Sequence, residues 1–470
     1  MDLLQVEKDQ IVDTSGQPVR LRGVNLGGWM MMENFMTGFP GVESSLRVAM
    51  ADVLGSSKAH FFFERLLEHF LTEDDIAFLA SLGMNGVRLN VNYRHFESDE
   101  DPFHYFESGF KRVNQVLEWC GRHNIYVVLD LHAVQGYQNS DWHSDNSSRH
   151  SFLWHNRQFQ DRFVALWEEF ARRYKGNPVI AGYGVMNEPL TGEFIGRFDD
   201  NQQPEWDVLN HVYRRVVSAI RAIDPDHIIY LEGDRFSVKF SGLDVPFADN
   251  LVYSSHNYNA STFGPGRYPG MIGGERWDAA RQEKHFLVDV EGFAFCQKQQ
   301  VPLWVSEFGA IYSADPVELP DRLRALDEQM SVFDKYAAHW SLWTYKDLGI
   351  MGIVNVQPDS GYMRVIQPVF SVKKELHADN WSHFLPPTQA VQLVNQLADL
   401  VEEEIDYPVA DSVANHRYMA QHLLSNYVAP LLQPVFARQF QGMSETISWT
   451  KCCNPFGSNN ARLTSRCSMF

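Results

Sequence analysis

The chain has 470 residues, of which 44% are hydrophobic and 21% charged, and its formal net charge is −19. This composition is ordinary for a soluble globular protein with a large core. The acidic balance argues against a nucleic-acid partner, because neutralising phosphates requires clustered Lys and Arg. No apolar run reaches the roughly 18 residues of a membrane span, so we expect no membrane partner.

The N-terminal segment MDLLQVEKDQIVD lacks the basic region and the long apolar stretch of a secretory signal. The 5 cysteines do not make a disulfide framework, and Cys452, Cys453 and Cys467 have no metal-ligand spacing to a fourth partner. These features favour a cytoplasmic, reduced protein. A secreted protein whose signal had already been removed would look the same.

Residues 6–20 predict a β-hairpin whose turn contains Ser15 and Gly16, and we expect this hairpin to plug the floor of the fold that follows. Short β-branched or aromatic runs then alternate with amphipathic helical stretches. The runs predicted as strands are Leu21–Leu26, Gly86–Val91, Tyr126–His132, Val179–Asn187, Ile228–Glu232, Leu251–Asn257, Leu303–Glu307 and Trp340–Thr344.

Nearly continuous apolar strands, each followed by a helix, indicate a parallel sheet that is buried on both faces. Helical stripes such as Phe110, Val113, Val116, Leu117 and Cys120 support this alternation. Eight such units predict an α/β protein with a (β/α)8 TIM barrel. An open doubly wound sheet is the alternative, but no Gly-rich phosphate loop follows the first strand.

The pattern changes after the eighth strand. Two further helices are predicted around residues 394–405 and 420–431, and the last 20 residues look loosely ordered. We therefore expect a barrel with its hairpin over residues 1–375 and a helical appendage over 376–470. The appendage packs on the barrel or forms a contact between copies of the chain in a homo-oligomer.

Two segments, VMNEP at 185–189 and VSEFG at 305–309, each place one glutamate at the end of an apolar run. The carboxyl ends of parallel strands are where the pockets of such folds open. Glu188 and Glu307 therefore predict an acid and a nucleophile facing each other across a cleft. The competing interpretation is two solvated glutamates or a structural ion pair.

Other predicted strands also end in polar or aromatic side chains. A lone histidine such as His132 is more often a core residue, but packing alone does not explain such side chains at six strand ends. These candidates for the site around the two glutamates are Arg88, His132, Asn187, His256, Tyr258 and Trp343.

The loop over residues 135–156 contains Tyr137, Trp142, His143, His150, Trp154 and His155 among polar residues. We interpret it as a saccharide-binding lid; metal binding and simple surface packing are the alternatives. The segment 28–41, which is rich in Met and Phe, either walls the opposite side of the cleft or packs over the barrel rim.

At these residues the chain resembles glycoside hydrolase family 5, the cellulase family of retaining (β/α)8 barrels. The matching segments include LRGVNLGGW (21–29), GMNGVRLNV (83–91), VLDLHAVQGYQN (128–139), GVMNEP (184–189), SHNY (255–258), SEFGA (306–310) and WSLWTYKD (340–347). The motifs LRGVNLGGW and LDLH are nearest to the exo-β-1,3-glucanase branch, although WTYKD departs from its pattern.

The resemblance implies that Glu188 is the acid/base, that Glu307 is the nucleophile, and that the other candidates surround them. Cleaving an acetal requires a proton for the leaving oxygen and stabilisation of positive charge at the anomeric carbon. We expect Arg88 to keep Glu307 ionised, Tyr258 to donate to Glu307, and His256 to set the proton affinity of Glu188. Because Glu188 is buried near another carboxylate, we also expect its pKa to be raised.

The resulting hypothesis is a retaining glycosidase that acts on β-glucosides or β-glucan-type oligosaccharides, with exo action favoured and with neither metal nor organic cofactor. One alternative is a family 5 enzyme specific for mannosides, galactosides or furanosides. Others are a barrel that binds carbohydrate without hydrolysing it and a metal-dependent hydrolase using the histidines of the third strand.

Overall fold

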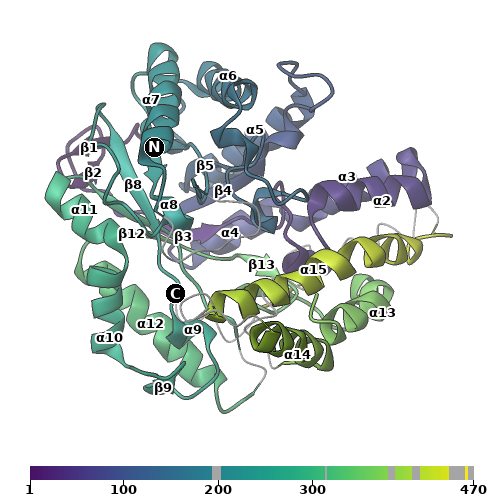
Figure 1. Ribbon diagram of the computed structural model, residues 1–470. Helices are drawn as coiled ribbons and strands as arrows, with labels where there is room; N and C mark the ends of the chain where they lie inside the picture. Colours follow the sequence, from purple (N-terminus) through teal and green to yellow (C-terminus); the bar gives the residue numbers. More distant parts are fainter. Residues whose placement is uncertain (193–202, 313–314, 379–386, 405–412, 444–460, 464–470) are drawn as a thin grey trace.

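The computed structural model describes residues 1–192, 203–312, 315–378, 387–404, 413–443 and 461–463 (Figure 1). Eight parallel strands close into a barrel in the order β3-β4-β5-β6-β7-β8-β11-β12. Their bounds are Arg22–Asn25 (β3), Gly86–Asn92 (β4), Tyr126–Ala133 (β5), Ile180–Gly184 (β6), Ile228–Glu232 (β7), Leu251–His256 (β8), Leu303–Glu307 (β11) and His339–Leu342 (β12). The predicted TIM barrel is therefore confirmed.

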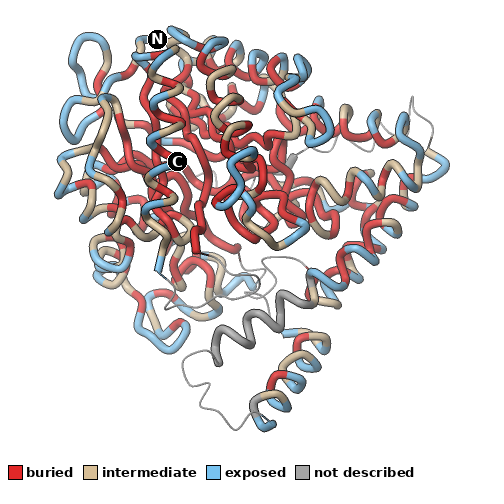
Figure 2. Tube along the Cα trace, turned by 45° about the horizontal axis from the view of Figure 1, so that its top comes forward, coloured by how far each residue is buried: buried red, intermediate tan, exposed pale blue. Residues whose placement is uncertain are grey.

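The strands lie in the interior because helices cover the outside of the barrel (Figures 1 and 2). Every residue of β4, β6, β7, β8 and β11 is buried. The main surrounding helices are α4 (Glu73–Ser81), α5 (Glu107–Arg122), α6 (Arg157–Tyr174), α7 (Trp206–Ile223), α11 (Glu291–Gln299), α12 (Leu319–Lys335) and α13 (Gly361–Glu375). The predicted apolar stripe of α5 is buried, so sequence periodicity identified the inward face of this helix.

Between β3 and α4 the chain adds α1 (Asn34–Thr37), α2 (Glu43–Leu54) and α3 (Ser56–Phe70), which the sequence analysis did not predict. Shorter elements decorate the barrel elsewhere. They are α8 (Asp234–Ser237), α9 (Ala260–Phe263), α10 (Ala279–Lys284), β9 (Gly270–Ile272), β10 (Glu275–Trp277), β13 (Lys346–Asp347), β14 (Val354–Val356) and β15 (Ala461–Leu463).

The N-terminal hairpin consists of β1 (Gln5–Glu7) and β2 (Gln10–Val12). Glu7 pairs with Gln10, so its turn is Lys8-Asp9, and the predicted turn position at Ser15-Gly16 is wrong. The latter residues form a second bend, inside a bridge between Val12 and Pro18. Leu4 and Ile11 pack in one apolar cluster with barrel residues, as expected of a floor plug; those residues include Val128, Ala181, Ile228, Tyr230 and Val252.

The two predicted C-terminal helices are α14 (Gln389–Glu404) and α15 (Val413–Arg438), and α15 runs alongside α2 (Figure 1). Val428 and Phe436 of α15 join the main core, whereas Tyr427 and Leu431 are 74% and 60% exposed. Packing against α2 thus decides which apolar side chains of this part of α15 are buried.

The domain boundary at residue 375 and the contact between copies of the chain stay predictions. Most of the last 20 residues lie outside the described part of the chain. Over the described residues, no helix combines the length and the apolarity needed to cross a membrane.

Candidate active site

The two glutamates approach each other at one end of the barrel. Glu307 is the last residue of β11. β6 ends at Gly184, three residues before the predicted Asn187, so Glu188 stands in the following loop, where its φ is +45°. One carboxylate oxygen of Glu188, one of Glu307 and a ring nitrogen of His256 all lie within 4.8 Å of one another. Both carboxyl groups can therefore reach the same bound atom.

Arg88 is the cationic centre of the site and is 1% exposed. Its Nη1 lies 2.5 Å from Glu307 Oε1. Its Nη2 donates over 2.8 Å to one oxygen of each of three side chains, those of Asp130, Asn187 and Glu232. A planar guanidinium suits this arrangement because it offers five N–H donors in fixed directions. Arg88 thus fixes the position of Glu307 and compensates its charge.

Tyr258 holds the other oxygen of Glu307. Its hydroxyl donates to Oε2 over 3.0 Å. Burial, together with the charges of Glu307 and Glu188, raises the pKa of Tyr258 well above its usual value, so the phenol stays a neutral donor. Arg88 and Tyr258 therefore leave the Glu307 carboxylate little freedom to rotate.

Glu188 lies between two histidines. His256 Nδ1 is 2.6 Å from its Oε1, and His143 Nε2 is 2.8 Å from its Oε2. Burial by itself would raise the pKa of Glu188, but the charges and hydrogen bonds of His143 and His256 outweigh burial and hold the pKa well below its ordinary value. The expectation of a raised pKa is therefore wrong, because it included the neighbouring carboxylate but not the two imidazolium groups.

His132 and Trp343 form a stacked pair, with ring centroids 5.3 Å apart and an interplanar angle of 5°. His132 Nδ1 lies 2.8 Å from Asp130 Oδ2, and Asn187 Nδ2 lies 3.3 Å from His132 Nε2. These contacts fix the imidazole from both sides. The structure thus brings every predicted site residue into one connected group, although their roles toward a substrate stay predictions.

Glu33, which the sequence analysis did not single out, also belongs to this group. It precedes α1, is 3% exposed, and accepts a hydrogen bond from Trp142 Nε1 over 3.0 Å. Burial raises its pKa to about 8, with His143 opposing and Glu307 adding to the shift. The signal available in the sequence was a lone glutamate within the apolar segment 28–41.

Glu232 was also missed, although it ends a predicted strand. Its Oε2 accepts from the backbone N–H of Glu188 over 2.7 Å, while Oε1 accepts from Arg88. Burial would raise its pKa, but His256 and Arg88 lower it to about 2. Glu232 is therefore an anion that accepts from the backbone of Glu188 and from Arg88, the cation that also holds Glu307.

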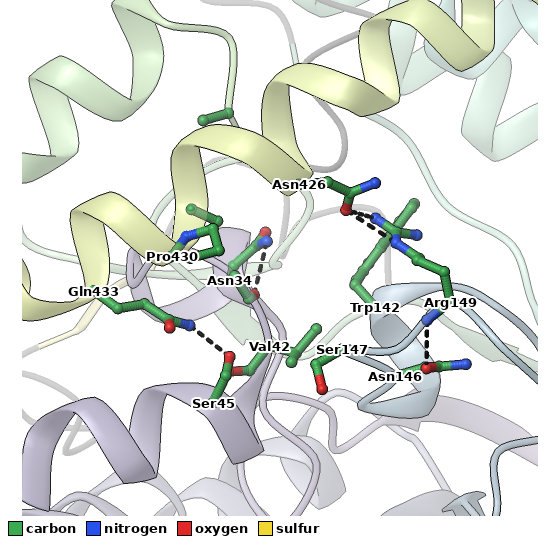
Figure 3. A pocket seen from close by; sticks show the side chains of 13 residues that line it. Asn34, Val42, Ser45, Trp142, Asn146, Ser147, Arg149, Asn426, Pro430 and Gln433 are labelled. Atoms are coloured by element: carbon green, nitrogen blue, oxygen red, sulfur yellow. Dashed lines mark hydrogen bonds between the residues drawn. The ribbon is translucent and has the colours of Figure 1, made fainter. Parts of the chain in front are cut away.

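The loop over residues 135–156, which we predicted as a lid, contacts the site through its short helix Trp142–Ser144: Trp142 donates to Glu33, and His143 lies beside Glu188. Behind Trp142, a cavity of about 170 Å³ separates this lid from α15 (Figure 3). Arg149 of the lid donates to Asn426 of α15, and Gln433 of α15 donates to Ser45 of α2. The C-terminal helix thus supports the lid; saccharide binding by the lid stays a prediction.

Among the described residues, Glu188, His256 and Glu307 are the group whose spacing suits a metal ion. His256 Nδ1 is already within hydrogen-bonding distance of Glu188, and Arg88 compensates Glu307. His132 and His143, the histidines considered for a metal, instead face Asp130 and Glu188. Each carboxylate thus has a cationic or N–H partner from the protein itself.

Comparison with known proteins identifies the family. Residues 52–349 match the family model described as cellulase, glycosyl hydrolase family 5. The chain belongs to glycoside hydrolase family 5. It is therefore a glycoside hydrolase, an enzyme that acts on carbohydrate substrates, as the motifs indicated.

Individual relatives in the family differ in their named activity. A β-xylosidase from Phanerodontia chrysosporium is 39% identical over 86% of this chain and 83% of its own. A probable glucan 1,3-β-glucosidase A from Aspergillus clavatus is 29% identical over 51% of this chain and 55% of its own. Among solved structures, an endogalactoceramidase aligns with a TM-score of 0.54 at 18% identity, covering 74% of this chain and 75% of its own. That likeness shows the fold alone.

Proposed function

We propose that this family 5 enzyme is a retaining, exo-acting β-glycosidase that hydrolyses β-glucosides or β-glucan-type oligosaccharides by double displacement. The observation that carries the proposal is the approach of Glu188 and Glu307 around His256, within 4.8 Å. Retaining glycosidases hold their two carboxyl groups about 5–5.5 Å apart, whereas inverting enzymes leave about 6.5–9.5 Å for a water molecule.

In the first step, Glu307 attacks the anomeric carbon while Glu188 protonates the glycosidic oxygen, and the aglycone leaves. Arg88 and Tyr258 direct the Glu307 carboxylate, since they occupy one oxygen each. Asn187 offers its amide to the sugar 2-hydroxyl, where contacts strengthen in the transition state. Trp343, stacked on His132, forms the platform beneath the reacting sugar.

In the second step, Glu188 removes a proton from water, and the resulting hydroxide equivalent attacks the anomeric carbon and releases Glu307. The sugar leaves with the configuration with which it arrived, because each step inverts that configuration once.

Exo action is supported by the enclosure of the site. Glu188 is 9% exposed and Glu307 4%, and the lid residues Trp142 and His143 are buried beside them. Glu33 closes the same side through its hydrogen bond with Trp142. Such burial of the two carboxylates suits a terminal sugar better than the middle of a polymer.

A β-xylosidase is the second candidate function. The named activity of the relative that is 39% identical over most of the chain favours it. Xylose lacks the hydroxymethyl group of glucose, so the two sugars would differ in their contacts with the apolar cluster that includes Phe35, Met36, Phe263 and Trp343 and packs against Tyr258.

The test is a panel of aryl β-glycosides: glucoside, xyloside, mannoside, galactoside and furanosides. The proposal expects the highest kcat/KM for the β-glucoside, and a higher value for the β-xyloside would replace it with the second candidate. NMR of the first anomer released tests retention, and an inverted first product would contradict double displacement. The lengths of the products from an oligosaccharide labelled at its reducing end distinguish exo from endo action.

A further inference from the structure

We propose that His143 shares one proton with Glu188 and supplies the proton that Glu188 gives to the glycosidic oxygen. This inference rests on the proposed acid/base role of Glu188. It assigns His143, from the lid, a direct part in proton transfer beyond the two carboxylates.

His143 and Glu188 lie within hydrogen-bonding distance of each other in a buried part of the site. His143 Nε2 lies 2.8 Å from Glu188 Oε2, and the two residues are 8% and 9% exposed. Glu188 Oε1 already faces His256 Nδ1 at 2.6 Å. A proton on Nε2 can therefore cross to Oε2 along one hydrogen bond, without leaving the protein.

Asn139 is placed to stabilise His143 after this residue has lost its proton. Its Oδ1 accepts from the backbone N–H of Asp141 over 2.9 Å, and its Nδ2 donates to the backbone oxygen of Glu188 over 2.9 Å. These two bonds fix the amide orientation. The same Nδ2 lies 2.9 Å from His143 Nε2.

This contact matters because an amide N–H is a donor. It repels a protonated Nε2 but donates well to the lone pair of a neutral one. Once the proton has passed through Glu188 to the leaving oxygen, the lone pair of Nε2 can therefore accept from Asn139. Coulomb attraction between the imidazolium and the carboxylate favours the proton on His143 over the proton on Glu188. The contact to Asn139 stabilises neutral His143 and so reduces this energy difference.

Charged groups surround the pair of His143 and Glu188. Burial opposes a charged His143, but Glu188, Asp141 and Glu33 face it and raise its pKa to about 9. Around Glu188 the further charged groups are His256, Glu307 and, at its backbone N–H, Glu232. At neutral pH the resting pair is thus imidazolium and carboxylate, so a proton is already present in the site.

Each turnover conserves the proton that His143 and Glu188 share. As the glycosidic bond breaks, Glu188 gives a proton to the leaving oxygen and receives one from His143 Nε2, which leaves His143 neutral and Glu188 ionised. In the second step, the proton that water loses passes through Glu188 back to His143. The pair therefore starts and ends each turnover with one proton.

The proposal is tested first by the pH dependence of kcat/KM for a poor leaving group, such as a phenyl glycoside. Interacting sites titrate as a pair, so the basic limb of the wild-type enzyme should reflect loss of the shared proton near pH 9. In His143→Gln the limb should reflect Glu188 alone and move by more than one unit to lower pH. Dinitrophenolate leaves without a proton, so the pH profile of kcat/KM for a dinitrophenyl glycoside should not shift in His143→Gln.

The matched control is His104→Gln, which alters an exposed histidine before α5 and should keep the wild-type profile. If His143→Gln lowers the rate but leaves the limb in place, His143 is only a structural support and the proposal is wrong. A kcat/KM limb that shifts equally for both leaving groups would also contradict it.

The second readout is NMR of ¹⁵N-labelled histidine, which needs no substrate. The pKa of His143 should lie near 9 and fall by more than one unit in Glu188→Gln; a value near 6.5 in both proteins would overturn the proposal. A wrong acid/base assignment for Glu188 would give a different result from a wrong role for His143. In that case Glu188→Ala would hydrolyse the phenyl glycoside at the wild-type rate, whatever the pKa of His143.

Discussion

His256 joins the two candidate catalytic carboxylates, since its Nδ1 lies 2.6 Å from Glu188 Oε1 and 3.6 Å from Glu307 Oε2. Burial opposes a charged His256, but Glu307, Glu232 and Glu188 raise its pKa well above the usual value. The imidazolium thus lies between carboxylates that would otherwise repel one another. Its position accounts for how two acidic groups approach closely inside a barrel.

The two glutamates should respond differently to removal. Glu307→Ala should form no glycosyl-enzyme with any leaving group, because the nucleophile is lost. Glu188→Ala should spare the first step for a dinitrophenyl glycoside and accumulate the intermediate, because water then lacks a base. Azide needs no deprotonation and should rescue turnover, giving the β-glycosyl azide from Glu188→Ala and the α-azide from Glu307→Ala. NMR of the products measures the configuration.

The opposite pairing of variant and azide anomer would exchange the roles of the two residues. Absence of rescue in both variants would contradict the double displacement.

Arg88→Lys should lower kcat/KM by about 10²-fold or more, because a misplacement of about 1 Å at a reacting group costs that much. Arg88 uses two nitrogens of its planar guanidinium to contact Glu307, Asp130 and Glu232. Lysine has a single nitrogen and cannot reproduce this geometry. Steady-state kinetics give the change, and circular dichroism checks that the variant folds. A variant with wild-type kcat/KM would show that the guanidinium geometry is unimportant.

Glu33→Gln should change how stability depends on pH. The folded protein holds the Glu33 proton up to about pH 8, whereas the unfolded chain releases it near 4.5. Between these values the native state binds more protons, so this residue makes stability fall as pH rises. Each pKa unit corresponds to about 1.4 kcal/mol. Urea unfolding at pH 5 and pH 8 should show the glutamine variant gaining relative to wild type at the higher pH.

Glu43→Gln provides a control of opposite sign. Burial opposes its ionisation, but Arg47 and His95 hold the pKa of Glu43 at about 2. Its contribution is therefore present above pH 4.5 and is lost as pH falls toward 2. Between pH 5 and pH 8 the stability difference between Glu43→Gln and wild type should therefore stay constant, and a trend identical to that of Glu33→Gln would argue against a neutral Glu33.

Lys346→Met should destabilise the fold by about 3–5 kcal/mol, because it leaves a buried carboxylate unpaired. Lys346 Nζ and Asp75 Oδ1 are 2.7 Å apart, and both side chains are fully buried. Arg157→Met, which breaks an exposed pair with Asp161, should cost no more than about 1 kcal/mol. Denaturant unfolding measures both, and equal losses would show that burial does not decide the effect.

Much of the barrel followed from local pattern. The runs at Ile228–Glu232 and Leu303–Glu307 became β7 and β11 with the predicted bounds, because continuous apolar strands suit a sheet covered on both faces. The candidate residues could be gathered because strand ends meet at one end of a barrel. The face of α15 could not be predicted, because it depends on packing against α2.

The sequence by itself thus determined the strand–helix order and the presence of two carboxylates, one at the end of β11 and one in the loop after β6, since both depend on periodicity and residue type. Only the tertiary structure decided the protonation of the site. His143 reaches Glu188 from a lid, and Glu33 reaches the same centre from the segment before α1. The pKa values of His143 and Glu33 depend on burial and on the neighbouring charges, and both of these are set by the folded barrel and not by local sequence.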